Sequence, residues 1–104
     1  MKTIFWTAYS HEDRFVAIKA IETIVNEYGF ITDFKQFSDI SISIKIELEA
    51  QKIDDLYDSL SNYLTLKESE KINSTSKQEY IVFLNVTFTK SSGNLRIEVP
   101  NVPG

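Results

Sequence analysis

The sequence of 104 residues contains no cysteine, which excludes disulfide bridges, thiolate metal sites and thiol nucleophiles. Glycine occurs only three times, at positions 29, 93 and 104, so no glycine-rich loop can cradle a phosphate group. The only histidine is His11, and a lone histidine lacks the ligand spacing that metal sites share. We therefore expect neither a metal site nor a cofactor.

Long hydrophobic runs are also missing from the sequence. No stretch approaches the roughly eighteen apolar residues that a membrane-spanning helix needs. Residues 1–9 carry one positive charge and a short apolar stretch broken by threonines, which is not the pattern of a signal peptide. We therefore expect a cytoplasmic protein that does not contact a membrane.

Basic residues are too few and too scattered for binding to nucleic acid. The chain has 15 acidic and 11 basic residues, which gives a formal net charge of −4. This balance disfavours phosphate backbones and anionic membranes as partners. Nucleic acid is therefore not expected as a partner.

Length and composition indicate a single domain over residues 1–104. A hydrophobic content of 42 % in 104 residues is enough for one core. Residues 65–78 are rich in Ser, Thr, Lys and Glu, so we predict a polar, mobile loop there. Pro100 and Pro103 predict an extended tail over residues 100–104.

The most regular pattern in the sequence lies between residues 40 and 49. Aliphatic residues alternate there with polar ones, and they are Ile40, Ile42, Ile44, Ile46 and Leu48. Strict period-two spacing predicts a strand with one buried and one solvent-facing side.

Two segments have helical periodicity. In the first, Ser10 is the expected N-cap and Gly29 the expected left-handed stop. Its expected buried stripe is Phe15, Ile18, Ile21, Val25 and Tyr28. In the second, the expected stripe is Ile53, Leu56, Tyr57, Leu60, Tyr63 and Leu64.

Further strands are predicted over residues 2–9, 30–37 and 79–89, and a short one over residues 95–99. The order of elements predicts an α+β, ferredoxin-like βαββαβ sandwich. Its antiparallel sheet would have the order 4-1-3-2 and carry both helices on one face. The short strand would lie at the edge beside the fourth strand or cross to a neighbouring subunit.

By fold analogy this layout is similar to small ligand-binding domains of the ACT and PII type and to dimeric cofactor-free monooxygenases. No local motif of those families matches the sequence, so no site residue is carried over from them.

The expected sheet places the end of the first strand beside the starts of the third and fourth strands. Tyr9 and His11 should then lie near Asp39 and Tyr80. A histidine bonded to an aspartate close to a phenol can act as a general acid or base. The alternative is that His11 is an exposed residue of the first helical turn.

The face of the sheet away from the helices is expected to expose Phe5, Tyr9, Ile81 and Phe83. Such an apolar patch is rarely left in contact with water, so a second copy of the chain is the expected cover. The alternative cover is the C-terminal segment 99–103. RNA binding is disfavoured because the central strand has no aromatic side chain on this face.

These observations predict a small non-enzymatic domain that forms a homodimer and acts as an interaction or ligand-sensing module. A rival hypothesis is a small-molecule-binding protein or cofactor-free enzyme that uses His11, Tyr9, Asp39 and Tyr80. A third possibility is that residues 65–78 close over a ligand as a lid.

Overall fold

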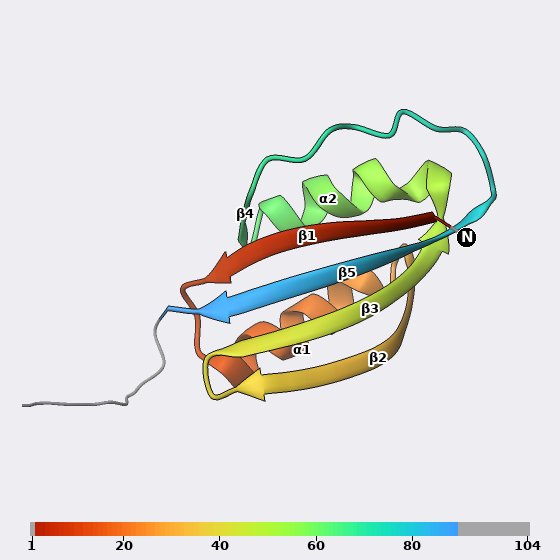
Figure 1. Ribbon diagram of the computed structural model, residues 1–104. Helices are drawn as coiled ribbons and strands as arrows, with labels where there is room; N and C mark the ends of the chain where they lie inside the picture. Colours follow the sequence, from red (N-terminus) through yellow and green to blue (C-terminus); the bar gives the residue numbers. More distant parts are fainter. Residues whose placement is uncertain (1, 90–104) are drawn as a thin grey trace, which may run out of the picture.

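The computed structural model describes residues 2–89. Its elements, in chain order, are β1 (Lys2–Ser10), α1 (Arg14–Val25), β2 (Gly29–Ser38), β3 (Ser41–Glu49), the 3₁₀ turn η1 (Ala50–Lys52), α2 (Ile53–Ser61), β4 (Thr65–Leu66) and β5 (Glu79–Phe88) (Figure 1). The strands form one sheet in the order β2-β3-β5-β1-β4. Buried residues of both helices join those of the strands in a single core, so both helices cover the same, inner face.

The centre of this core is the pairing of β3 with β5. Every second residue of both strands is buried, and in β3 these are Ile42, Ile44, Ile46 and Leu48. The antiparallel register places Ile44 beside Leu84 and Ile46 beside Val82. The alternation predicted for residues 40–49 therefore forms the β3 strand, except that Ile40 lies before it and is exposed.

Helix α1 begins after Asp13 and not after Ser10. The Asp13 carboxylate accepts a hydrogen bond from the Phe15 backbone N–H at 3.0 Å, whereas the Ser10 hydroxyl accepts one from the Glu12 N–H at 3.1 Å. The buried side chains of α1 are Ala17, Ile21 and Val25. Phe15, which was expected in this stripe, is 70 % exposed.

Helix α2 buries the aliphatic stripe that its periodicity predicts, namely Ile53, Leu56 and Leu60. The hydroxyl groups of Tyr28 and Ser59 lie 2.6 Å apart and link the segment after α1 to α2. The two helices are therefore held to each other by a polar contact as well as by the shared core.

The predicted ferredoxin-like topology is wrong. β5 pairs with β1 in parallel, from Lys2 opposite Tyr80 to Ser10 opposite Phe88. On its other side β5 pairs with β3 antiparallel, so the last long strand lies between β1 and β3. The sheet is mixed, and the similarity to ACT, PII and monooxygenase layouts, which depended on the 4-1-3-2 order, does not hold.

The physical cause of this difference is the path of residues 67–78, here called the strap. After α2, the strands β4 and β1 pair antiparallel. The strap then runs back along α2, and its successive contacts are with Tyr57, Asp58, Asp54, Gln51 and Ala50. Twelve extended residues span up to ~40 Å, which exceeds the roughly 33 Å of a ten-residue strand. β5 therefore starts at the opposite end of the sheet from the one expected (Figure 1).

This path also bears on the short strand predicted over residues 95–99. Those residues, the turn before them and the tail over 100–104 lie outside the described residues. Both edges of β5 are occupied, by β1 and by β3. The placement of residues 95–99 stays a prediction.

Gly29 does not end a helix in a left-handed conformation, because no described glycine has a positive φ. It opens β2 where the backbone of β3 comes very close. A Cβ atom at this position would clash with the carbonyl oxygen of Glu47 and would lie 2.6 Å from the Cβ of Leu48. Glycine is required here by the close approach of the two chains.

Replacing Gly29→Ala should therefore lower the free energy of unfolding by about 1–3 kcal/mol, because backbone atoms of β3 must move. Urea denaturation measures this change. Gln36→Ala, at an exposed position of the same strand, is the control and should change stability far less. Equal stabilities for Gly29→Ala and the parent would show that the two strands are not in this close contact.

Candidate functional site

The structure places Tyr9, His11 and Asp39 at one end of the sheet and Tyr80 at the other. Tyr9 pairs with Thr87, and Thr87 pairs with Ser41, just after the turn that holds Asp39. Tyr80 pairs with Lys2. Tyr80 and Thr87 lie seven positions apart along β5, a distance of roughly 23 Å. The four residues named for the catalytic hypothesis are therefore not brought together.

His11 is engaged at the ends of β1 and β5. Its Nδ1 lies 3.0 Å from the Thr89 hydroxyl, and that hydroxyl donates to the Ser10 carbonyl at 3.1 Å. Since the single hydroxyl proton goes to Ser10, the ring nitrogen acts as donor. This contact ties two strand ends together.

Asp39 pairs with Arg14 and not with His11. The Arg14 Nη1 donates to the Asp39 carbonyl oxygen at 3.3 Å and lies 3.9 Å from its Oδ1. The contact fixes the start of α1 beside the turn between β2 and β3. The Asp39 side chain is almost fully exposed, so the ion pair contributes little to stability.

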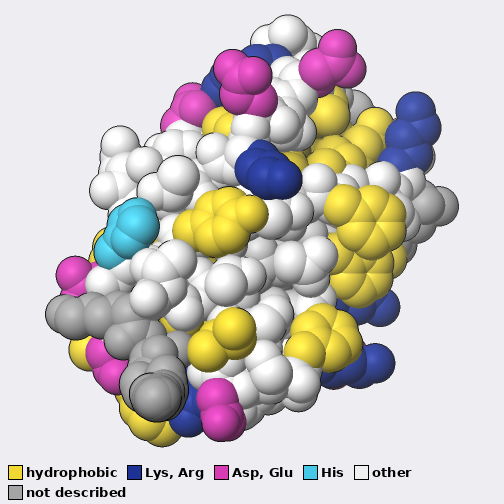
Figure 2. Space-filling model, turned by 60° about the vertical axis from the view of Figure 1, so that its left-hand side comes forward, with side chains coloured by type: hydrophobic (Ala, Val, Ile, Leu, Met, Phe, Trp, Pro, Cys, Tyr) yellow, Lys and Arg dark blue, Asp and Glu magenta, His cyan; other side chains and the backbone are white. Residues whose placement is uncertain are grey.

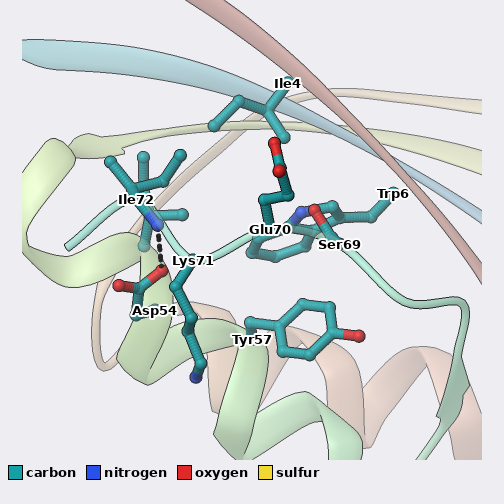
Figure 3. A pocket seen from close by; sticks show the side chains of 9 residues that line it. Ile4, Trp6, Asp54, Tyr57, Ser69, Glu70, Lys71 and Ile72 are labelled. Atoms are coloured by element: carbon teal, nitrogen blue, oxygen red, sulfur yellow. Dashed lines mark hydrogen bonds between the residues drawn. The ribbon is translucent and has the colours of Figure 1, made fainter.

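A more constrained arrangement lies where the strap crosses α2 (Figure 3). The Asp54 carboxylate accepts hydrogen bonds from the backbone N–H groups of Ile72 and Asn73 at 2.9 and 2.8 Å. Asn73 has a φ of 51°, in the left-handed region. Asp54 therefore holds the turn at the middle of the strap, and Ile72 packs against the core.

The space beneath the strap is nearly filled. Ile4, Trp6, Ile53 and Tyr57 form its floor, and residues 69–72 cover it. Figure 3 shows the side chains of Ile4, Trp6 and Tyr57 around this part of the strap. The remaining cavity of about 10 Å³ is close to the room that one water needs. A ligand could enter here only if the strap left Asp54.

Outside the strap, Tyr57 and residues 68–70 line an open depression of about 320 Å³. The Tyr57 hydroxyl donates to the Lys67 carbonyl oxygen at 2.8 Å, and its ring meets the Trp6 ring edge to face, with centroids 5.3 Å apart. Tyr57 therefore connects the strap to the core.

Lys71 adds a charged contact between the strap and α2. Its Nζ lies 2.7 Å from Asp58 Oδ1, and this hydrogen bond raises the pKa of Lys71 above its ordinary value. A raised lysine pKa means that the contact stabilises the fold at neutral pH and is lost only as the pH rises through that pKa. The pair is exposed, so its effect is small.

Tyr63 has a buried hydroxyl without a hydrogen-bond partner among the described residues. Burial raises the pKa of this hydroxyl, and the negative charge of Glu12 raises it further. An unpaired buried hydroxyl costs stability, because it has lost its water.

Two stacked aromatic rings, one exposed and one partly buried, lie on the uncovered, outer face of the sheet. Phe5 and Phe83 are cross-strand neighbours with ring centroids 5.4 Å apart and an interplanar angle of 14°. Phe5 is 69 % exposed. Ile81 lies in the next row of this face, beside Thr3. These three apolar residues, Phe5, Ile81 and Phe83, are called the outer-face patch.

Tyr9 also lies on the outer face but outside the outer-face patch. It pairs with Thr87, and the polar pair Thr7 and Asn85 separates it from Phe5 and Phe83. Figure 2 shows hydrophobic side chains at several separate places with polar surface between them. The role of Phe5, Tyr9, Ile81 and Phe83 as an interface stays a prediction.

The sequence reasoning missed two features. The first is the hold of Asp54 on the strap, for which a signal in the sequence is Asn73, a residue type that tolerates a left-handed turn. The exposed phenylalanines of β2 are Phe30, Phe34 and Phe37. Their spacing does not alternate, because β2 has register irregularities between Ile31 and Asp33 and between Gln36 and Ser38.

Comparison with protein family models, curated proteins and solved structures finds no match to this chain. Within residues 2–89, no group of three or more acidic or histidine side chains is arranged to hold a metal ion. In the same part of the chain, the helices are too short and too polar to cross a membrane.

Replacing Asp54→Ala should free the strap, because two backbone N–H groups lose their charged acceptor. We expect a loss of about 2 kcal/mol in the free energy of unfolding and faster trypsin cleavage after Lys67, Lys71 or Lys77. Asp55→Ala is the matched control, since Asp54 and Asp55 both lie in the first turn of α2. Identical digestion of the two variants would contradict the anchoring role.

Replacing Tyr63→Phe should raise the free energy of unfolding by about 1 kcal/mol, because it removes an unpaired hydroxyl. Tyr28→Phe should lower it by about 1 kcal/mol, because Ser59 loses its partner. Chemical denaturation of both variants gives the comparison. A loss for Tyr63→Phe as large as that for Tyr28→Phe would mean that the Tyr63 hydroxyl is bonded.

Proposed function

We propose that this protein is a small non-enzymatic interaction module that associates with a second copy of itself through the outer-face patch. The observation that carries the proposal is the stacked pair of Phe5 and Phe83 on the face that no helix covers. Exposed aromatic rings on a flat sheet are typical of contact surfaces between proteins.

The charges around the outer-face patch support a copy of the same chain as the partner. Lys45 pairs with Phe83 across the strands, and Glu47 pairs with Ile81. Opposite charges thus lie in adjacent rows of the same face. A two-fold axis through the patch would let each Lys45 approach Glu47 of the other copy, as a self-complementary interface requires.

The competing enzymatic hypothesis has less support. His11 is bonded to Thr89, Asp39 is paired with Arg14, and Tyr80 lies at the far end of the sheet. A ligand site beneath the strap would need the strap to open, because the space there holds about one water. Direct association between copies needs no such rearrangement.

Sedimentation velocity at micromolar concentration tests the proposal. The parent should sediment as a dimer or larger species, and Phe83→Asp should raise the dissociation constant of the outer-face contact by about 100-fold, as for a central interface residue. Asn85→Asp adds the same charge on the same face, two residues after Phe83, and should change this dissociation constant far less. A strictly monomeric parent, or equal association of parent and Phe83→Asp, would remove the support for this function.

A further inference from the structure

The strand β2 has one unpaired edge. It is hydrogen-bonded to β3 on one side, and within residues 2–89 no strand lies on its other side (Figure 1). At the opposite border of the sheet, β4 pairs with β1. Unpaired backbone groups along an edge strand can pair with another chain.

Apolar side chains surround this edge. Phe34 is 42 % exposed although it lies on the inner face, where it pairs with Ile44. Helix α1, which packs against β2, exposes Phe15 and Val16. With Ile18 and Lys19 they line an open groove of about 680 Å³. The edge thus offers both backbone groups and apolar surface.

The charged residues of β2 favour a second copy of the same chain as the partner of this edge. Asp33 and Lys35 are exposed and flank Phe34. They pair with Lys45 and Ser43, so both lie on the outer face, whereas Phe34 lies on the inner face. The register irregularities on either side confine regular pairing to residues 33–36.

We propose that two copies of the chain pair antiparallel through their β2 edges, centred on Phe34. In this register Phe34 faces Phe34 of the other copy, and each Asp33 faces Lys35. Two opposite-charge pairs then flank an aromatic centre. The two α1 helices come to lie on the same side of the joined sheet, where their exposed apolar side chains are brought closer together.

Other registers are penalised. A shift by one residue places Phe34 opposite Lys35 and turns the second copy over, so that its inner face and its α1 lie on the opposite side of the joined sheet. A shift by two places Asp33 opposite Asp33, or Lys35 opposite Lys35, and like charges directly opposite are destabilising. The centred register therefore fits the pleat and pairs opposite charges. The edge is separate from the outer-face patch and extends the proposed self-association.

Charge reversal tests this pairing. The experiment is made in the Phe83→Asp background, which disables the outer-face patch, and circular dichroism checks that each variant is folded. Lys35→Asp puts carboxylates at positions 33 and 35, and Asp33→Lys puts ammonium groups at both. Each variant alone should have a dimer dissociation constant raised about tenfold or more. An equimolar mixture should form a heterodimer with an affinity within about threefold of the Phe83→Asp parent.

The mixture separates the possible outcomes. Recovery of association only on mixing supports the β2 pairing and excludes a general effect of charge. A folded mixture that stays monomeric overturns the pairing, and so does a monomeric Phe83→Asp parent, which would leave the outer-face patch as the single contact. Unchanged association of both reversal variants also overturns it.

A second pair of variants distinguishes loss of the β2 contact from loss of the fold. Phe34→Glu should abolish β2 pairing, since it places two carboxylates at the centre, whereas Phe30→Glu lies outside the regular stretch and should preserve it. Hydrogen exchange of the β2 backbone should slow as protein concentration rises. Protection that does not depend on concentration would mean that a segment of the same chain covers the edge, and would overturn the proposal.

Discussion

The fold depends on the anchoring of the strap to α2. Two backbone N–H groups bind the Asp54 carboxylate, and the contacts on either side run from Tyr57 within α2 back to Ala50 in η1. This path carries the chain back to the end of the sheet where β3 finishes. β5 then enters beside β3 at Glu49 and Glu79 and runs parallel to β1.

The elements with strong periodicity could be predicted from the sequence, whereas their connection could not. The alternation from Ile42 to Leu48 and the stripe Ile53, Leu56 and Leu60 both report burial, which repeats with the geometry of strand or helix. The strap has no periodic sequence pattern. The Asp54 carboxylate holds it through backbone N–H groups, which do not depend on the type of side chain. The expected position of Tyr80 depended on the predicted direction of the last strand. Because that direction is reversed, Tyr80 does not lie near His11.

The two faces and the β2 border of the sheet differ in the polarity of their side chains. Its inner face is a continuous apolar core, whereas its outer face combines polar residues with the outer-face patch, Tyr9 and Phe30. Its β2 border combines an aromatic residue with charges of both signs. In β2, the residues from Thr32 onward are exposed on both faces. Apolar residues there do not contribute to the core. The free-energy cost of exposing them to water must therefore be offset by contact with another surface.

The parallel pairing of β1 with β5 has a mechanical consequence. The first and last described strands are direct neighbours in the middle of the sheet, joined from Lys2 and Tyr80 to Ser10 and Phe88. Tension applied at Lys2 and at Thr89 would load this ladder lengthwise, in shear. All of its hydrogen bonds would have to yield nearly together, whereas a hairpin pulled at its open end unzips one bond at a time. The arrangement gives the domain resistance to stretching along its long axis.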